Sequence, residues 1–303
     1  MKPFEIGIDL GGTKVEAILF DPRGRELFRR RVATPREEDD TYRAIVETVG
    51  SLIKTTARQI PQGADYTVGV GIPGIQDPAS RRITGANTTS LIGRPFQDDL
   101  QARLGHAVAI ENDANCFTLA EALKGAARDF GMVFGVILGT GCGGGLCING
   151  RIHHGRHGIA GEWGHYAMDP SGGACFCGNM GCVETKISGT WVAKDHQQRT
   201  GRQLTMQQIV AGAHQGEAEC RETIERFLEA FGRALGGLIS ILDPDAVVIG
   251  GGLSNIDELY SEGRERVAKY AFHPHITTPI LKNRLGDSAG VYGAAWIGRS
   301  TAS

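Results

Sequence analysis

The amino-acid sequence predicts an α/β fold of two domains, and three observations support this prediction. A strand, a glycine turn containing a threonine and a second strand begin at residues 7–13 and again at residues 136–141. Strand-like and helix-like segments alternate along the chain, which is typical of α/β proteins. The length of 303 residues is enough for two domains of ordinary size. The repeated opening predicts that both domains derive from one duplicated βββαβα-type unit.

The first half of the chain is expected to form one sheet with flanking helices. Apolar or alternating runs predict strands at residues 4–10, 15–20, 26–32, 66–72 and 108–110. Helical spacing predicts helices at residues 41–59 and 96–104, and a third helix from Asn112-Asp113 to about residue 123. Thr41 precedes the apolar residues Ile45 and Val49 at the right distance to be the N-cap of the first helix.

The second half repeats this order with a longer glycine loop. Strands are predicted at residues 132–138, 146–148 and 246–249, a glycine loop at 139–145 and a helix at 224–242. A last helix near residues 290–299 is expected to return to the first domain. The predicted domains are therefore residues 1–112 with 290–303, and residues 113–289.

Composition excludes several classes of protein. The formal net charge is −2, with 32 Lys and Arg against 34 Asp and Glu, so a nucleic acid is not an expected partner. No uninterrupted apolar run approaches the roughly 18 residues of a membrane span, and no signal peptide is recognisable at the N-terminus. The seven cysteines are an odd number and three of them cluster, which argues against a disulfide framework and for a cytoplasmic protein.

Glycine turns after strands indicate phosphate binding, because backbone N–H groups can approach an oxyanion closely where no Cβ intervenes. In the first turn Thr13 and Lys14 add donors, and Asp9 ends the strand where it could hold Mg²⁺. The alternatives are an ordinary tight hairpin and a surface lysine. Neither the P-loop nor the dinucleotide fingerprint is present.

Two further glycine loops follow apolar strands in the second half. Residues 139–145 contain five glycines in seven positions, which leaves space that a ligand could fill. Residues 250–252 are three successive glycines, suited to packing against adenine or ribose. The candidate nucleotide-binding residues are Asp9, Gly11, Gly12, Thr13, Lys14, Gly139, Thr140, Gly141, Gly143, Gly251 and Gly252.

One histidine and three cysteines have the composition of a metal site. His165, Cys175, Cys177 and Cys182 supply the Cys₃His ligand set of a tetrahedral structural Zn²⁺. The alternative is three unrelated buried thiols. A site closed by four protein ligands leaves no position for catalysis, so such a metal would serve folding and loop placement. The other four cysteines, Cys116, Cys142, Cys147 and Cys220, are interpreted as ordinary buried thiols.

The three glycine loops together resemble those of the actin-like ATPase (ribonuclease H-like) fold. Residues 175–184 match the pattern C-x-C-G-x-x-G-C-x-E, and residues 162–165 match E-x-G-H, both typical of the ROK family of repressors, open reading frames and sugar kinases. The resemblance implies ATP-dependent phosphorylation of the primary 6-hydroxyl of a hexose, with Mg²⁺ and a structural Zn²⁺. It also implies a homodimer whose interface lies on the second domain.

The resemblance also assigns roles to individual residues. Asp113 corresponds to the catalytic base; from its position alone it could equally be a helix N-cap. The substrate-binding candidates are Gly74, Asn87, Asn112, Asp113, Glu162, His165 and Glu184. For Gly74 and Asn87 the alternatives are a turn glycine and a loop amide. His153, His154 and His157 could form a metal cluster, but we interpret them as a solvated loop near the sugar site.

Within the family, several stretches resemble the bacterial fructokinase (mannokinase) branch. These are residues 34–36 (Thr-Pro-Arg), 139–143, 160–165 and 290–296. The short segment 166–174 differs from that branch and is more like the glucokinases. Fructose is therefore the first expectation, with glucose, mannose and N-acetylglucosamine as alternatives. A sugar-responsive transcriptional regulator is the alternative from another class; it is disfavoured because the first phosphate strand starts at residue 4, with no room before it for a DNA-binding module.

Overall fold

The computed structural model describes residues 2–36 and 40–301. Two compact units make up the chain. The first unit contains the chain up to Ala120, the segment His154–Ala160 and the chain from Asp287 onward. The second unit contains Glu121–His153 and Gly161–Gly286. No helix in the described part of the chain is long and apolar enough to cross a membrane.

The sheet of the first unit has the strand order β3-β2-β1-β4-β7. Its strands are β1 (Phe4–Leu10), β2 (Lys14–Phe20), β3 (Glu26–Ala33), β4 (Tyr66–Ile72) and β7 (Ala109–Asn112). β1, β2 and β3 pair antiparallel, whereas β1, β4 and β7 pair parallel. The carboxyl ends of β1, β4 and β7 therefore lie at the same edge of the sheet. A two-stranded hairpin, β5 (Ile75–Gln76) with β6 (Ile83–Thr84), follows β4.

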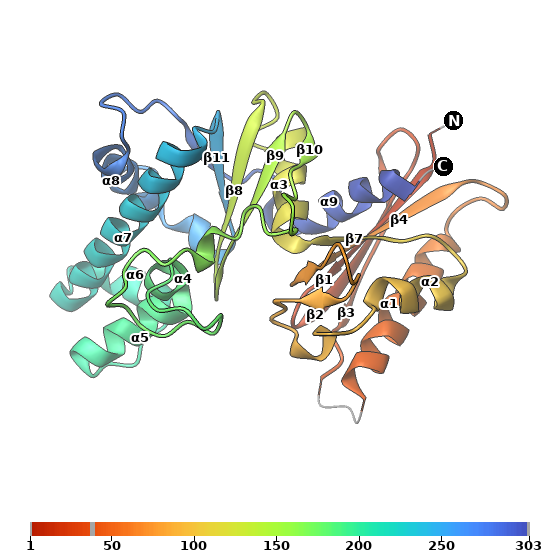
Figure 1. Ribbon diagram of the computed structural model, residues 1–303, viewed down its shortest axis with the longest axis horizontal. Helices are drawn as coiled ribbons and strands as arrows, with labels where there is room; N and C mark the ends of the chain where they lie inside the picture. The colour runs from red at the N-terminus through yellow and green to blue at the C-terminus, as the bar shows by residue number, and fades with distance from the viewer. Residues whose placement is uncertain (1, 37–39, 302–303) are drawn as a thin grey trace. The chain divides into compact units, whose positions relative to one another are not determined.

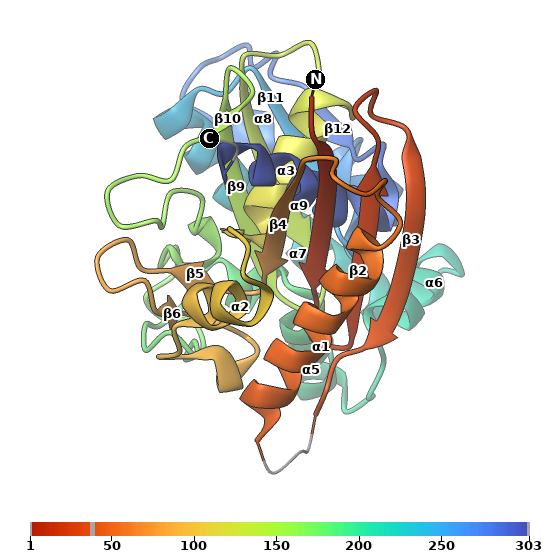
Figure 2. The ribbon, with the colours of Figure 1, turned by 90° about the vertical axis from the view of Figure 1, so that its right-hand side faces the viewer.

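Helices cover both faces of this sheet, as Figures 1 and 2 show. α1 (Thr41–Ala57) and α2 (Phe96–Leu104) bury their apolar residues against one face, and α9 (Ala289–Ile297) lies on the other. The approach of α9 is unusually close. A Cβ atom at Gly7 would lie 2.3 Å from the backbone oxygen of Val291, and one at Gly69 would lie 1.9 Å from that of Ala294. Glycine is therefore required at both strand positions.

The sheet of the second unit has the order β10-β9-β8-β11-β12. Its strands are β8 (Met132–Leu138), β9 (Cys142–Ile148), β10 (Arg151–Ile152), β11 (Ala246–Gly250) and β12 (Ile280–Lys282). β8, β9 and β10 pair antiparallel, and β8, β11 and β12 pair parallel. Strand order and directions repeat those of the first unit, which is what the repeated sequence pattern predicts.

The remaining helices belong mainly to the second unit. They are α3 (Asp113–Leu123), whose residues after Ala120 belong to this unit, α4 (Glu184–Ile187), α5 (Gly189–Thr200), α6 (Met206–His214), α7 (Ala218–Leu242) and α8 (Glu262–Tyr270). α7 packs against α6 and α8, with Phe227, Phe231 and Leu235 fully or almost fully buried in the core of this unit (Figure 1).

The structure corrects several expected boundaries. Asp40, not Thr41, is the N-cap of α1, and its side chain accepts a hydrogen bond from the backbone N–H of Arg43. β7 is displaced towards Asn112, and α7 begins six residues before the predicted helix at 224, at Ala218. Several short elements were not predicted: β5, β6, β10, β12, α4, α5, α6 and α8.

The most informative correction concerns the glycine loop at 139–145. β9 already begins at Cys142, so Gly143, Gly144 and Gly145 pair with β8. A Cβ atom at Gly144 would lie 2.7 Å from Trp163 Cδ1, and the indole Nε1 of Trp163 donates a hydrogen bond of 3.0 Å to the Gly143 oxygen. The space beside Gly144 is therefore filled by the protein itself, and is not available to a ligand.

The α9 contact generates a test of the fold. We expect Gly69→Ala to lower the free energy of unfolding by about 1–3 kcal/mol or more, because the new methyl group would overlap the backbone of α9. Gly237→Ala in α7 is the matched control, since no atom lies within 4 Å of the added Cβ. Helix propensity should make that control about 0.5–1 kcal/mol more stable. Thermal or urea unfolding measures both variants, and equal stabilities would contradict the close packing.

Candidate active site

The predicted site residues are shared between the two units. The first unit carries Asp9, Gly11, Gly12, Thr13, Lys14, Gly74, Asn87, Asn112 and Asp113. The second unit carries Gly139, Thr140, Gly141, Gly143, Glu162, His165, Cys175, Cys177, Cys182, Glu184, Gly251 and Gly252.

The β1–β2 hairpin presents its turn to solvent at the carboxyl end of β1. The backbone N–H of Gly11 donates to the Lys14 oxygen at 2.9 Å, which closes the turn. Gly12 and Thr13 are exposed, and Lys14 is half-buried. The turn is therefore narrow and lacks a side chain at its first two positions. Such backbone N–H groups are well suited to bind an anion.

Asp9 lies next to this turn in a largely buried position. Burial raises its pKa to about 7, and the negative charges of Asp113 and Glu16 add to this shift. Two glycines lie next to this carboxylate. A Cβ atom at Gly290 would lie 3.3 Å from Asp9 Oδ2, and one at Gly71 would lie 3.7 Å from Oδ1. Two carboxylates close enough for one to raise the pKa of the other are a donor set that fits a hard divalent cation such as Mg²⁺.

Asn112 and Asp113 lie where β7 meets α3. The Asn112 side-chain oxygen accepts hydrogen bonds from the backbone N–H of Ala114 at 2.9 Å and Asn115 at 3.2 Å. Asn112 therefore performs the capping role that position alone would have allowed for Asp113. Asp113 is the first helical residue and its Oδ1 also accepts from Ala114 N at 2.8 Å. The N-terminus of α3 favours a negative charge at this position.

Gly74 and Asn87 lie close to the Asn112 amide. The Asn112 Nδ2 donates to the Gly74 oxygen at 3.3 Å, and the backbone N–H of Asn87 donates to the Pro73 oxygen at 3.0 Å. A Cβ atom at Gly74 would lie 2.7 Å from the Cβ of Ala86. The structure therefore brings Gly74, Asn87 and the Asn112-Asp113 pair together at one edge of the sheet.

Glu111 and His154 support the Asn112-Asp113 pair, although neither was predicted from the sequence to do so. Glu111 Oε1 accepts from the backbone N–H of Asn112 and from Asn115 Nδ2, both at 2.9 Å. Glu111 Oε2 lies 2.6 Å from His154 Nε2, and this hydrogen bond raises the pKa of the histidine. Glu111 directly precedes Asn112 in the sequence, which was the one signal that could have drawn attention to it.

In the second unit, the tip of the β8–β9 hairpin contacts two other glycine segments. The backbone N–H of Gly189 donates to the Gly139 oxygen at 2.8 Å. Gly251 has φ +79°, and a Cβ atom there would lie 2.3 Å from the Leu138 oxygen, so this position requires glycine. A Cβ atom at Gly139 would lie 4.0 Å from Gly252 N. The predicted hairpin tip and the loop after β11 are therefore neighbours.

Two carboxylates lie beside the same hairpin. Glu184 Oε2 accepts a hydrogen bond of 3.0 Å from the backbone N–H of Cys142, and a Cβ atom at Gly141 would lie 2.9 Å from that oxygen. Burial, and next the charge of Glu184, raise the pKa of Glu162. Glu162 and Glu184 therefore form a second pair of neighbouring carboxylates, and they flank the candidate metal ligands in the sequence.

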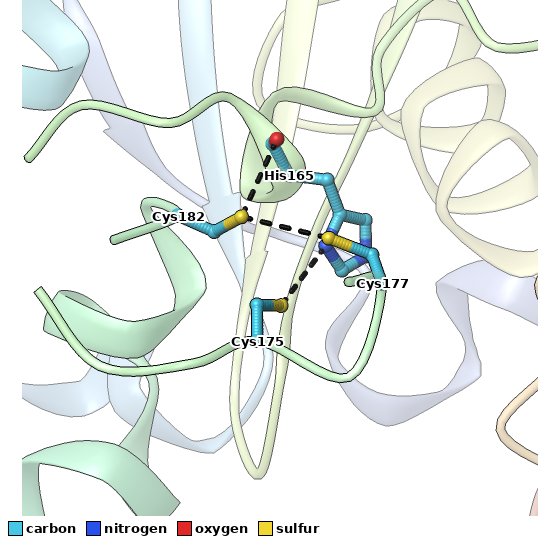
Figure 3. A group of neighbouring side chains, drawn as sticks. All are labelled: His165, Cys175, Cys177 and Cys182. Atoms are coloured by element: carbon cyan, nitrogen blue, oxygen red, sulfur yellow. Dashed lines mark hydrogen bonds between the residues drawn. The ribbon is translucent and has the colours of Figure 1, made fainter. Parts of the chain in front are cut away.

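His165, Cys175, Cys177 and Cys182 converge on one point (Figure 3). Their ligand atoms all lie within 4.8 Å of one another. Cys175 Sγ lies 3.5 Å from His165 Nδ1, and Cys177 Sγ lies 3.6 Å from Cys182 Sγ. Ligands at the edge of a tetrahedron around zinc are about 3.6–3.8 Å apart, so the donor set and its spacing fit Zn²⁺.

The backbone of this loop is shaped for the cluster. Gly178 and Gly181 have φ +93° and +64°, and a Cβ atom at Gly181 would lie 1.5 Å from the Asp169 oxygen. No other group of three or more metal-binding side chains occurs in the described ranges, so His153, His154 and His157 form no such cluster there. Cys116, Cys142, Cys147 and Cys220 are buried, as expected.

Comparison with known proteins gives these residues a context. Residues 5–301 match the ROK family. The N-acetyl-D-glucosamine kinase of Yersinia enterocolitica is 38% identical over 304 residues, which cover 96% of this chain and 98% of that protein. The N-acetyl-D-glucosamine kinase of Pectobacterium carotovorum is 40% identical over 301 residues, which cover 96% of this chain and 97% of that protein.

Solved structures of ROK family proteins are also similar to this chain. A ROK hexokinase from Thermus thermophilus has a TM-score of 0.85 and 31% identity, and the match covers 96% of both chains. A ROK family glucokinase from Streptomyces griseus, in complex with glucose and AMPPNP, has a TM-score of 0.79 and 30% identity, with 98% of this chain and 99% of that chain covered. These relatives are sugar kinases that match over nearly their whole length. The chain belongs to the ROK family.

Proposed function

We propose that the protein is an ATP-dependent hexose kinase whose preferred substrate is N-acetyl-D-glucosamine. The observation that carries phosphoryl transfer is the Asp9–Asp113 pair beside the glycine hairpin of the first unit. The choice of sugar is based on the relatives described above, which are N-acetyl-D-glucosamine kinases 38–40% identical to this chain. The expected assignment to the fructokinase branch is not supported by these relatives, and fructose becomes the alternative substrate.

Asp113 acts as the general base in this proposal. Its carboxylate takes the proton of the sugar 6-hydroxyl, the hydroxyl oxygen attacks the γ-phosphorus of ATP, and the bond to the β-phosphate oxygen breaks to release ADP. Glu111 and Asn112 hold the first turn of α3, so the base is fixed before the sugar arrives. When bound beside Asp9, Mg²⁺ would neutralise charge on the phosphates.

Sugar hydroxyls need groups that accept and donate hydrogen bonds in fixed positions. In the first unit, Asn112 provides an amide for this role. In the second unit, Glu162, Glu184 and His165 provide carboxylate oxygens and an imidazole. The His165 Nδ1 faces Cys175, which leaves Nε2 for the sugar. The glycines of the two hairpins and Gly251-Gly252 are assigned to ATP, because they offer backbone N–H groups and uncovered backbone surface.

The Cys₃His cluster is proposed to hold a structural Zn²⁺. Its four ligands would close the coordination sphere, and the metal would stabilise the loop without taking part in the reaction. Glu162 lies three residues before His165, and Glu184 lies two residues after Cys182. The metal would therefore fix the separation of the two carboxylates that bind the sugar.

The substrate is tested by measuring ADP release with a panel of sugars. We expect the highest kcat/KM with N-acetyl-D-glucosamine and lower values with glucose, mannose and fructose. A site that hydrogen-bonds the acetamido group would discriminate against sugars lacking it, because its polar groups would be left unpaired. A highest kcat/KM with fructose would restore the fructokinase assignment. No ADP release with any hexose would refute the kinase proposal.

The base is tested with Asp113→Asn, which keeps the size of the side chain and removes its charge. We expect kcat to fall by at least about 10²–10⁴-fold, the usual contribution of a general base. Asp129→Asn, an exposed carboxylate with 81% of its side chain accessible, is the control and should retain activity. Circular dichroism checks folding, and near-normal turnover of folded Asp113→Asn would refute the assignment.

The metal is tested by elemental analysis of protein purified without chelator. We expect about one zinc per chain, because four ligands converge on one point. Cys177→Ser should lose the zinc and lower the melting temperature, since metal binding stabilises such loops. Cys220→Ser changes a buried thiol elsewhere and should keep the zinc. Absence of zinc from the wild-type protein would overturn this part of the proposal.

A further inference from the structure

Arg36 lies against the turn of the β1–β2 hairpin, outside the residues assigned to ATP so far. We infer that Arg36 binds the phosphate chain of ATP together with this hairpin. The inference rests on the proposed function, because it takes the hairpin to be the phosphate site. It adds a charged residue to a site that is otherwise made mainly of backbone N–H groups.

The guanidinium is held by the turn itself. Arg36 Nε donates a hydrogen bond of 2.7 Å to the Gly12 oxygen, and Nη2 contacts the same oxygen. A Cβ atom at Gly12 would lie 3.7 Å from Arg36 Nη2, so the guanidinium packs against a residue without a side chain. Both Gly12 and Thr13 are exposed, and the guanidinium is therefore next to the open part of the turn.

The segment that carries Arg36 is tied to the same hairpin. The Thr34 backbone N–H donates to the Thr13 oxygen at 3.0 Å, and Thr34 Oγ1 donates to the Gly11 oxygen at 2.7 Å. Thr34 is buried, and Pro35 restricts the backbone between it and Arg36. These bonds order the backbone before Arg36, so less conformational entropy is lost when the side chain binds a ligand.

Among the described residues, the arginines near this hairpin differ in their ion pairs. Arg29 and Arg31 of β3 form ion pairs with the buried Glu16 at 2.9 and 3.0 Å. For Arg36, no ion pair is present within residues 2–36 and 40–301. Its two hydrogen bonds use Nε and Nη2, which leaves the N–H groups of Nη1 for another acceptor. Guanidinium groups bind phosphate oxygens strongly, because their planar donors match the oxygens and carry charge.

The test separates a phosphate contact from simple support of the hairpin. Arg36→Gln removes the charge and keeps an amide donor, Arg36→Lys keeps the charge, and Thr34→Val removes the hydroxyl that holds the hairpin without changing charge. Arg43→Gln, an exposed arginine of α1, controls for net charge. Calorimetry measures the binding of ATP, adenosine and inorganic tripolyphosphate to each folded protein, and steady-state assays give KM for ATP and for the sugar.

For Arg36→Gln we expect ATP and tripolyphosphate to bind at least about tenfold more weakly, as is usual for a lost hydrogen bond to a charged group. Adenosine affinity and the KM for the sugar should be unchanged, and Arg36→Lys should recover part of the loss. The salt dependence of ATP binding should be smaller in Arg36→Gln than in the wild type, because one charge contact is missing.

Two results would overturn the inference while leaving the proposed function intact. One is a wild type that binds ATP and phosphorylates the sugar, with Arg36→Gln unchanged in both. The other is an equal loss of ATP affinity in Arg36→Gln, Arg36→Lys and Thr34→Val, which would mean that Arg36 only supports the hairpin. A wild type that binds neither ATP nor tripolyphosphate would refute both the inference and the proposed function.

Discussion

The close packing of α9 on β1 and β4 is the constraint on which the first unit depends. It requires glycine at Gly7 and Gly69, because the helix backbone occupies the space of a side chain. Asp9 is two residues after Gly7, and side chains two apart in a strand share a face, so Asp9 faces the start of α9 at Gly290. The same contact that stabilises the unit therefore buries the Asp9 carboxylate and raises its pKa. Stability and the proposed phosphate chemistry share one surface of the sheet.

The second unit repeats the sheet and uses it differently. In the first unit the shared edge of β1, β4 and β7 carries the glycine turn of the β1–β2 hairpin and also the polar side chains of Asp9, Asn112 and Asp113. In the second, the corresponding edge carries backbone: the β8–β9 turn and the glycines after β11. Its carboxylates, Glu162 and Glu184, come instead from the loop around the Cys₃His cluster. Both edges of the repeated scaffold therefore carry a glycine turn, and the strand ends of the first unit add polar side chains to it.

Much of this arrangement could be predicted from the sequence, and the exceptions have physical causes. β1, β4, β8 and α2 have the predicted bounds, because each is an apolar or amphipathic run with clear flanking residues such as Pro73-Gly74. Gly143 to Gly145 were not predicted as part of a strand. Their packing involves Trp163, which lies 20 residues after Gly143 in the sequence and donates a hydrogen bond to its backbone oxygen. The Glu111–His154 bond joins residues 43 apart, and no local pattern indicates such a pair. The predicted site residues themselves, Asp113 among them, stay predictions until they are tested by mutation.

The stretches that resembled the fructokinase branch do not distinguish one hexose from another, and their places in the fold explain why. The stretches that resembled the fructokinase branch build parts that any sugar kinase of this fold would need. Residues 34–36 hold the first hairpin, residues 139–143 form the second, and residues 290–296 belong to the helix that packs on Gly7 and Gly69. Residues 160–165 supply Glu162 and His165, which would recognise hydroxyls that hexoses share. A match over such stretches therefore indicates a shared fold and a shared phosphoryl-transfer reaction. Discrimination between an acetamido group and a hydroxyl depends on the surface next to the sugar's second carbon, which none of these four stretches identifies. A resemblance built on scaffold residues can therefore indicate the family without indicating which sugar is bound.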